Sequence, residues 1–305
     1  MDDEEYQKLG FIQSVNLGGV VDVDRVIGWL QNFQVNLKTI GFKSVSDLPK
    51  IEGSALVIDK SMASTKFFEQ IHHLKDYHGV IICCDRALYQ IIPYIFPSKE
   101  DKLRVVETQN NYSFISPNGT RPPDAPTYVC NLDSSSLCLS FFDRPDVKRV
   151  MDKVTAVFSV TTNPLTIRHF HGKRYFFTPY MMGLTDTLQF KSGTPYIRTG
   201  GQVASFAWVL AYALGAKTIG TFGITHSFDS MAETEYPGAA HERIEGLYGT
   251  CWQDQTYRFY NDTYLKLIRE GKKDGVETIN CSKAGLLYNS NVIDMSLQEY
   301  VEKYE

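Results

Sequence analysis

Short apolar runs separated by helical stretches constrain the fold of this 305-residue chain more than any other feature. Each run is almost continuously apolar, which is typical of strands buried on both faces of a parallel sheet. Alternation of such strands with helices predicts an α/β fold, with a mostly parallel, Rossmann-like sheet and helices on both faces. The runs are SALVID (54–59), GVIICC (79–84), LRVVET (103–108), TYVCNL (127–132), VTAVFSV (154–160), KTIGTF (217–222) and VETIN (276–280).

Helical spacing of apolar residues is clearest near the two ends of the chain and in one central segment. Apolar residues recur every three or four positions over residues 22–38, and residues 203–214 are apolar on nearly every side, as in a buried helix. Residues 252–275 carry large apolar side chains on one face, and a capping box at 296–299 opens the last helix. We expect these two C-terminal helices to be structural.

The chain shows no repeat and no low-complexity linker, so we expect one domain with additions. A helical lead-in is predicted at 1–50 and a Rossmann-like core at 51–230. Residues 231–305 are predicted to complete the same domain with one strand and two helices. The stretch 108–126, rich in Asn, Pro and Gly, is predicted to be a loop.

Charge and cysteine content exclude several classes of protein. A net charge of −4 and a pI near 6.0 give no overall positive field, which argues against nucleic acid or an anionic membrane as the main partner. The acidic start MDDEEYQKLG and the lack of a long apolar run favour a cytosolic protein without a membrane segment. The six cysteines lack the spacing of a disulfide framework or a metal site, so we expect reduced thiols. The sequence leaves open whether the protein forms a homo-oligomer.

Polar residues follow the predicted strands where a ligand would bind. In an open parallel sheet, ligands lie beyond the carboxyl ends of the strands. Capping of the next helix explains any one of these polar groups, but six groups on one edge predict a ligand or metal site. Asp133 would then belong to its acidic part. The groups are Asp59-Lys60-Ser61, Asp85-Arg86, Asn131-Leu132-Asp133-Ser134-Ser135, Thr161-Thr162-Asn163, Thr225-His226 and Cys281-Ser282-Lys283.

A glycine pair and two histidines add to this edge. Gly200 and Gly201 stand just before the buried helix, where a phosphate could approach the free N–H groups at the positive end of the helix dipole; a tight turn is the alternative. His226 follows a strand and should enter the crevice, and His241 lies beyond an acidic, glycine-containing loop. The basic segment 168–174, with its H-x-H pair, is interpreted as a patch that faces phosphate.

Several well-defined catalytic motifs do not occur in the sequence. It contains no G-x-x-x-x-G-K-[ST], no G-x-S-x-G and no H-E-x-x-H. These absences argue against a P-loop NTPase, a typical α/β-hydrolase and a zincin protease. The first sheet strand is followed by DKSMAS rather than G-x-G-x-x-G, which argues against a standard NAD-dependent dehydrogenase.

The order of ALVID, GVIICCDRAL, TYVCNLDSS and GGQVASFAWVLAYALGAKTIGTFG, with the lead-in NFQVNLK, resembles the 6-hydroxymethylpterin diphosphokinase MptE-like family. The resemblance implies an α/β transferase that uses Mg²⁺ to move diphosphate from ATP to a hydroxymethyl group of a pterin-like acceptor. Thiamine pyrophosphokinases are similar in their acidic residues, which here would be Asp85 and the turn 131–134. The broad family also includes motility-associated proteins related to sialyltransferases.

Two positions depart from the pattern of this family. The family's glycine-rich turn after the first strand is replaced here by Asp59-Lys60-Ser61-Met62-Ala63-Ser64. The first carboxylate of the acidic pair is replaced by Asn131, which can ligate Mg²⁺ through its carbonyl oxygen but brings no charge. These departures keep three functions open.

The first, which is the function we predict, is Mg²⁺-dependent diphosphate transfer from ATP to a hydroxymethyl group of a pterin-like small molecule; the other two are alternatives. The second is transfer of a sugar from a nucleotide-sugar donor, with His226 or His241 as base, and the third is a non-catalytic nucleotide-binding relative. We predict catalytic roles for Asp133, Asp85 and His226, and metal ligation by Asp133, Asp85 and Asn131. Substrate or nucleotide contacts are predicted at Asp59, Ser61, Asn131, Ser134, Thr161, Asn163, Gly200, Gly201, Thr225 and His241.

Overall fold

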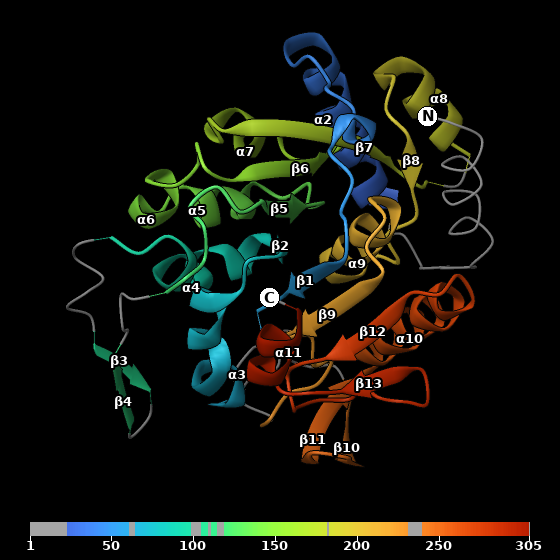
Figure 1. Ribbon diagram of the computed structural model, residues 1–305. Helices are drawn as coiled ribbons and strands as arrows, with labels where there is room; N and C mark the ends of the chain where they lie inside the picture. The colour runs from blue at the N-terminus through green and yellow to red at the C-terminus, as the bar shows by residue number, and fades with distance from the viewer. Residues whose placement is uncertain are drawn as a thin grey trace.

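A parallel sheet forms the centre of the protein in the computed structural model, which describes residues 23–60, 65–98, 105–108, 111–114, 119–181, 183–230 and 240–304 (Figure 1). Among these residues, nine strands pair in the order β13-β12-β9-β1-β2-β5-β6-β7-β8, and every pair is parallel. The expected α/β, Rossmann-like architecture is confirmed. The division of the chain into a lead-in, a core and a C-terminal part stays a prediction.

Six of these strands coincide with predicted apolar runs, while β7, β8 and β13 were not predicted. β7 begins with the charged residues Lys173 and Arg174, so it does not start as an apolar run. β8 and β13 are too short to show an apolar pattern. The strands are β1 (Ser54–Ile58), β2 (Val80–Cys84), β5 (Thr127–Asn131), β6 (Thr155–Ser159), β7 (Lys173–Pro179), β8 (Tyr196–Ile197), β9 (Thr218–Phe222), β12 (Glu277–Asn280) and β13 (Val292–Asp294).

The helices cover both faces of this sheet (Figure 1). After β1, a short α-helix over residues 65–70 continues directly into a 3₁₀ helix over residues 71–76. The helices are α2 (Val23–Thr39), α3 (Thr65–Gln70), η2 (Ile71–Asp76), α4 (Asp85–Ile95), η4 (Ser136–Cys138), α5 (Leu139–Phe142), α6 (Pro145–Lys148), α7 (Pro164–His169), α8 (Thr185–Ser192), α9 (Val203–Ala213), α10 (Gln255–Lys273) and α11 (Leu297–Tyr304).

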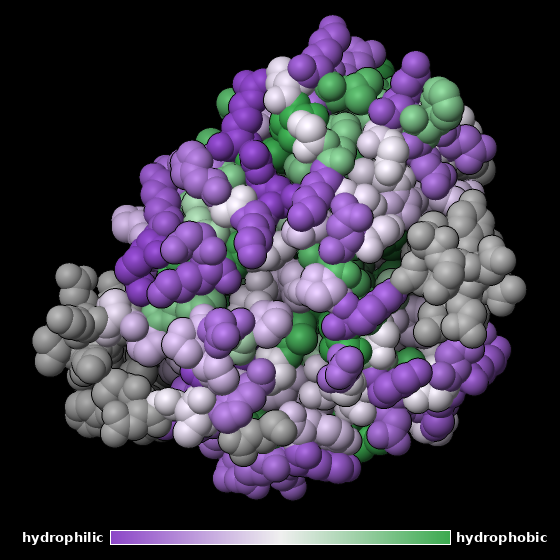
Figure 2. Space-filling view, turned by 45° about the horizontal axis from the view of Figure 1, so that its top comes forward, coloured by the Kyte–Doolittle hydropathy of each residue, from purple (hydrophilic) through white to green (hydrophobic). Residues whose placement is uncertain are grey.

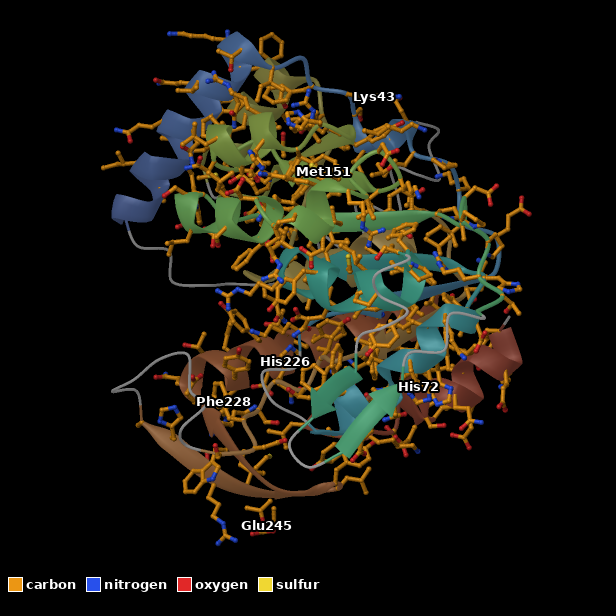
Figure 3. All side chains as sticks on the ribbon, turned by 90° about the vertical axis from the view of Figure 1, so that its left-hand side faces the viewer. Lys43, His72, Met151, His226, Phe228 and Glu245 are labelled. Carbon is orange, nitrogen blue, oxygen red and sulfur yellow. The ribbon has the colours of Figure 1, made fainter. Side chains whose placement is uncertain are left out.

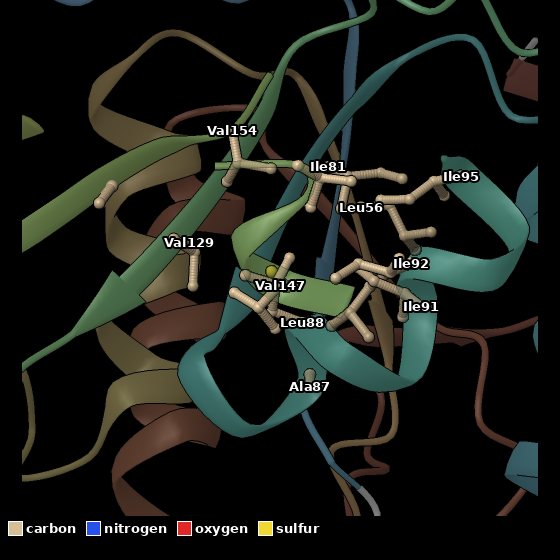
Figure 4. Close-up of a cluster of buried hydrophobic side chains, with 14 of the residues drawn as sticks. Leu56, Ile81, Ala87, Leu88, Ile91, Ile92, Ile95, Val129, Val147 and Val154 are labelled. Atoms are coloured by element: carbon tan, nitrogen blue, oxygen red, sulfur yellow. The ribbon is translucent and has the colours of Figure 1, made fainter. Parts of the chain in front are cut away.

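Two hydrophobic cores form because successive residues of a strand point to opposite faces of the sheet. Leu56 and Ile58 pack into the core that includes α4 and α11, which we call the α4 core; part of it is shown in Figure 4. Ala55 and Val57 pack into the core that includes α9 and α10, which we call the α9 core. This alternation continues to the last residues of each strand and decides which polar side chains can meet.

One predicted strand does not belong to the central sheet. β3 (Val105–Thr108) pairs antiparallel with β4 (Asn111–Phe114) in a two-stranded sheet set apart from the main body (Figure 1). The prediction of 103–108 as a strand of the main sheet is therefore wrong, as is the prediction of 108–126 as a loop throughout. Local composition favours a strand here but does not specify its partner. A second hairpin joins β10 (His241–Gly246) to β11 (Gly249–Asp254).

The thiols and the surface agree with the composition. All six cysteines are buried and free, as expected. Hydrophilic side chains cover much of the face shown in Figure 2, and its hydrophobic residues occur in small groups. Within the described ranges, the longest and most apolar helices fall short of what a membrane crossing requires.

Two asparagines of α2 form hydrogen bonds with the residues that follow β6. The Asn36 side-chain nitrogen donates to the carbonyl oxygens of Val160 at 3.0 Å and Thr162 at 2.8 Å. Asn32 donates in the same way to Thr161, at 3.2 Å. Asn36 is fully buried, so its amide satisfies backbone carbonyls that water cannot reach.

We expect Asn36→Ala to lower the free energy of unfolding by about 2–3 kcal/mol, because two buried carbonyl groups lose their donor. Urea unfolding would measure the change. Val35→Ala is the matched control on the same helix: Val35 is 40% exposed, and its loss should cost no more than about 0.5 kcal/mol. Equal effects of the two substitutions would contradict the role given to Asn36.

Candidate functional site

The path of the chain through the sheet marks one place for a ligand. From β1 the chain proceeds outward through β2, β5, β6, β7 and β8, then returns to place β9 on the other side of β1, followed by β12 and β13. Such a reversal opens a crevice beyond the carboxyl ends of the two strands at the switch point. Here these strands are β1 and β9.

Asp59 and the segment 223–226 form the edge of this crevice. The Asp59 amide donates to the Phe222 carbonyl oxygen at 2.9 Å, so the two strand ends stay together. Gly223 has a φ of +75°, and a Cβ on it would lie 2.1 Å from the Asp59 carbonyl oxygen. Only glycine allows so close an approach. The half-buried Asp59 continues the alternation of Ala55 and Val57, and thus lies on the face of the α9 core.

His226, labelled in Figure 3, follows the carboxyl end of β9 in an unusual backbone conformation, with a φ of +49°. Its Nδ1 lies 3.2 Å from Asn261 Oδ1, and its Nε2 lies 3.1 Å from Gln202 Nε2. An amide oxygen only accepts and an amide nitrogen only donates, so Nδ1 carries the proton and Nε2 accepts from Gln202.

Burial keeps the His226 ring neutral. The side chain is 3% exposed, and burial lowers its pKa to about 4, although the bond with Asn261 opposes this shift. Gln253 also fixes the backbone, since its side-chain nitrogen donates to the His226 carbonyl oxygen at 3.0 Å. His226 is therefore a fixed, uncharged link between Asn261 on α10 and Gln202 at the start of α9.

The start of α9 combines a tight turn with an uncapped helix end. Gly200 and Gly201 have φ angles of +65° and +83°, and a Cβ on Gly200 would lie 2.7 Å from Thr263 Cγ2. The turn therefore requires glycine for structural reasons. Gln202 holds the N-cap position, but its side chain makes no capping bond and contacts His226 instead. The backbone N–H groups of the first turn of α9 can accordingly bind an anion.

Helix α10 lines the same crevice, although its sequence pattern suggested a purely structural helix. Asn261 bonds His226, and the Tyr264 ring centroid lies 5.5 Å from that of His226. Thr263 and Tyr260 lie against Gly200 and Gly201. The signal that could have revealed this role is the pair Asn261 and Thr263, polar residues that are buried with the apolar face of the helix.

Asp85 and Asn131 lie on the opposite face, in the α4 core. Asn131 follows the alternation of Val129, which belongs to that core, and its side-chain nitrogen donates to Asp85 Oδ2 at 2.5 Å. The other Asp85 oxygen accepts from the Arg86 amide at 2.7 Å. Burial raises the pKa of Asp85 despite these donors, and the exposed Asp133 nearby adds to the rise.

This donor set does not fit a resident Mg²⁺ ion. Both Asp85 oxygens already accept hydrogen bonds. Asn131 Oδ1 has no partner, but the residue is completely buried and brings no charge. Asp133 is exposed, and its Oδ1 accepts from the Ser135 amide at 2.8 Å. Across the described ranges, no three His, Cys, Asp or Glu side chains gather as metal ligands would.

The residues after β6 bind one another rather than face an open crevice. The hydroxyls of Thr161 and Ser159 lie 2.7 Å apart, and Thr161 is buried. Asn163 caps α7 by accepting from the Leu165 amide at 3.0 Å, and its side-chain nitrogen donates to the Ser134 carbonyl oxygen at 3.2 Å. Their predicted contacts with substrate stay predictions.

Thr225, His241, Ser61 and the basic segment 168–174 are the remaining predictions. The Thr225 hydroxyl, beside His226, donates to the Ser227 carbonyl oxygen at 3.2 Å. His241 begins β10, with its ring centroid 6.1 Å from that of Phe228. Ser61 lies outside the described residues. The basic segment 168–174 ends α7 and begins β7, so it lies at the amino ends of the strands, across the sheet from the crevice.

Residues 125–230 match a family model. The family is described as 6-hydroxymethylpterin diphosphokinase MptE-like, which confirms the resemblance seen in the sequence. The matched segment runs from β5 past β9, so it includes the glycine turn and His226 but leaves out Asp59, Asp85 and α10.

The fold is also similar to a solved structure, the MAf glycosyltransferase from Magnetospirillum magneticum AMB-1, with a TM-score of 0.58 and 15% sequence identity. The alignment covers 88% of this chain and 38% of that chain, and this likeness concerns the fold. The comparison with curated proteins finds no match. The family description and the name of the solved structure both denote group transferases.

We expect the stability of the wild-type protein to fall as pH is lowered from about 6.5 to about 4, because His226 is neutral when folded. Its folded-state pKa of about 4 lies below the unfolded value of 6.5, so the unfolded chain takes up the proton first. The contribution is complete above pH 6.5 and amounts to about 3 kcal/mol.

Urea unfolding between pH 4.5 and 7.5 would show this slope in the wild-type protein and a flatter one in His226→Gln. His171→Gln, at an exposed histidine, is the matched control and should keep the wild-type slope. A His226→Gln protein with an unchanged slope would show that His226 is not buried in its neutral form.

Proposed function

We propose that this protein transfers a sugar from a nucleotide-sugar donor bound at the switch point between β1 and β9. One observation carries the proposal: the sheet sorts the polar side chains of its carboxyl edge onto two faces. Asp59, His226 and the start of α9 share one crevice, while Asp85 and Asn131 are bonded to each other on the opposite face.

The donor's phosphate is assigned to the start of α9. The uncapped first amides of the helix and its dipole favour an anion there. Arg198 stands two residues before Gly200, and its guanidinium lies 4.2 Å from the ring centroid of Tyr180, which is 44% exposed. Arg198 thus brings a positive charge beside the glycine turn. Tyr180 offers an aromatic surface at the same edge.

Asp59 is assigned as the base that accepts the proton of the acceptor hydroxyl. The acceptor oxygen forms a bond to the sugar's anomeric carbon, and the bond from that carbon to the phosphate oxygen breaks, its electron pair leaving with the nucleotide. His226 is assigned a positioning role, since its Nε2 already accepts from Gln202. The amides of α9 stabilise the charge on the leaving phosphate.

Diphosphate transfer from ATP is the second candidate, because the family model over residues 125–230 carries that description. In this case Mg²⁺ would arrive with ATP as part of the substrate. The carboxylates of Asp85 and Asp133 could engage it only if Asn131 released Asp85, with which it shares a 2.5 Å bond. The third function, nucleotide binding without turnover, differs from both by the absence of any product.

We expect a nucleotide-sugar to raise the melting temperature by about 5 °C at a concentration a hundredfold above its Kd, whether or not Mg²⁺ is present. A thermal-shift panel of ATP, GTP, CMP, UDP, CMP-N-acetylneuraminate and UDP-glucose, with Mg²⁺ or EDTA, would test this. Asp59→Asn should slow hydrolysis of the bound donor by about a hundredfold and change its Kd little.

Asp262→Asn, an exposed aspartate on α10, is the matched control and should retain full hydrolysis. A shift with ATP that requires Mg²⁺ would instead favour diphosphate transfer. Donor binding with no hydrolysis or transfer would favour a non-catalytic relative. No shift with any nucleotide would refute all three.

The second candidate yields a separate prediction for Asn131→Asp. This change places a second carboxylate within 2.5 Å of Asp85 in a buried site, which should lower the melting temperature by several degrees in EDTA. Mg²⁺ should then restore part of the loss in the variant and leave the wild-type protein unchanged. Stabilisation of the wild-type protein by Mg²⁺ alone would mean that its own residues hold the ion.

A further inference from the structure

The hydroxyl of Tyr264 is buried and has no hydrogen-bond partner in the structure. Tyr264 lies on α10 and its side chain is fully buried in the α9 core. Buried hydroxyl groups almost always find a partner, because removal from water without a replacement bond is unfavourable. Thr166 and Ser227 also carry buried hydroxyls without a hydrogen-bond partner, and each such group requires an explanation.

Two other deeply buried aromatic polar groups, those of Tyr300 and Trp208, are satisfied by the fold. The Tyr300 hydroxyl donates to the Ala55 carbonyl oxygen at 3.0 Å and accepts from the Gly220 amide at 3.3 Å. Trp208 Nε1 donates to Thr278 Oγ1 at 3.1 Å. Tyr264 belongs to the same layer as Trp208, so general loose packing does not account for its unpaired hydroxyl.

Tyr264 belongs to the crevice at the switch point. Its ring centroid is 5.5 Å from that of His226, and Thr263, the residue before it, lies against Gly200. Burial holds the pKa of Tyr264 well above its ordinary value, and Cys84 and Asp59 add to the rise. The hydroxyl therefore stays protonated under the electrostatic influence of Asp59, and it can both donate and accept.

The surroundings select the chemistry of a ligand group at this hydroxyl. An anionic phosphate would be repelled by the carboxylate of Asp59, whereas a neutral hydroxyl group would meet both a donor and an acceptor. The start of α9, which favours phosphate, lies next to this position through the contact of Gly200 with Thr263. A sugar joined directly to a phosphate has this arrangement of groups.

We propose that Tyr264 is a sugar-binding residue, whose hydroxyl bonds a hydroxyl group of the donor's sugar beside Asp59. This inference rests on the function proposed above and names the part of the donor that α10 recognises. Asp59 and Gln202 are half-buried, and Gln202 contacts His226, whose ring lies beside that of Tyr264. The alternative is a buried water molecule held for structural reasons only.

Tyr264→Phe tests the proposal, because it removes the hydroxyl and preserves the ring. The free variant should melt at the wild-type temperature or slightly above it, since an unpaired buried group is lost. Its Kd for UDP-glucose or CMP-N-acetylneuraminate, whichever stabilises the wild-type protein, should rise roughly three- to tenfold by calorimetry. Its Kd for the matching free UDP or CMP should stay unchanged.

Tyr300→Phe is the matched control. Its hydroxyl makes two bonds inside the fold, so its loss should lower the melting temperature by several degrees and leave the ratio of the two Kd values unchanged. A Tyr264→Phe protein that is destabilised like Tyr300→Phe would overturn the proposal in favour of a structural water.

The binding results separate this inference from the proposed function. Equal affinity of wild-type and Tyr264→Phe proteins for the nucleotide-sugar would overturn the inference while the proposed function stands. Equal affinity of the wild-type protein for free nucleotide and nucleotide-sugar would also overturn it, because the sugar would then add nothing to the free energy of binding. Failure of the wild-type protein to bind any nucleotide-sugar would overturn both.

Discussion

Alternation of side chains across the parallel sheet is the constraint on which the rest of the site depends. The carboxyl ends of parallel strands share one edge, but residues one position apart on a strand face opposite layers of helices. Asp59 and Asn131 therefore belong to different cores, although both end buried strands of one sheet. The edge carries two separate polar environments, one beneath α4 and one between α9 and α10.

Neutral amides connect the polar groups of both environments. Asn36 holds α2 to the sheet, Asn131 engages Asp85, and Asn261 fixes the proton position of His226. An amide offers both donors and an acceptor without a charge, so it can be buried at lower cost than an ion pair. At Asp85 this hydrogen bond has a chemical effect, because a carboxylate that already accepts from an amide is a poor binding site for a cation.

The sequence was sufficient to predict the fold class, six central strands and the edge at which polar residues gather. It could not assign β3, because antiparallel pairing with β4 depends on a partner that local composition does not specify. The two faces were missed because sorting of the clusters requires the position of each strand end. The role of α10 was missed because Asn261 and Tyr264 meet His226 only through a long-range contact.

The position of α10 has a consequence for how this fold could diversify. The segment that matches the family model supplies β5 to β9, the glycine turn and His226, whereas α10 lies beyond it and supplies Asn261 and Tyr264. Together with Asp59 after β1, the crevice is thus assembled from three stretches of chain that can vary separately. Replacement of the residues on one face of α10 would change which ligand the crevice binds and leave the sheet intact. The helix would then act as an interchangeable specificity element.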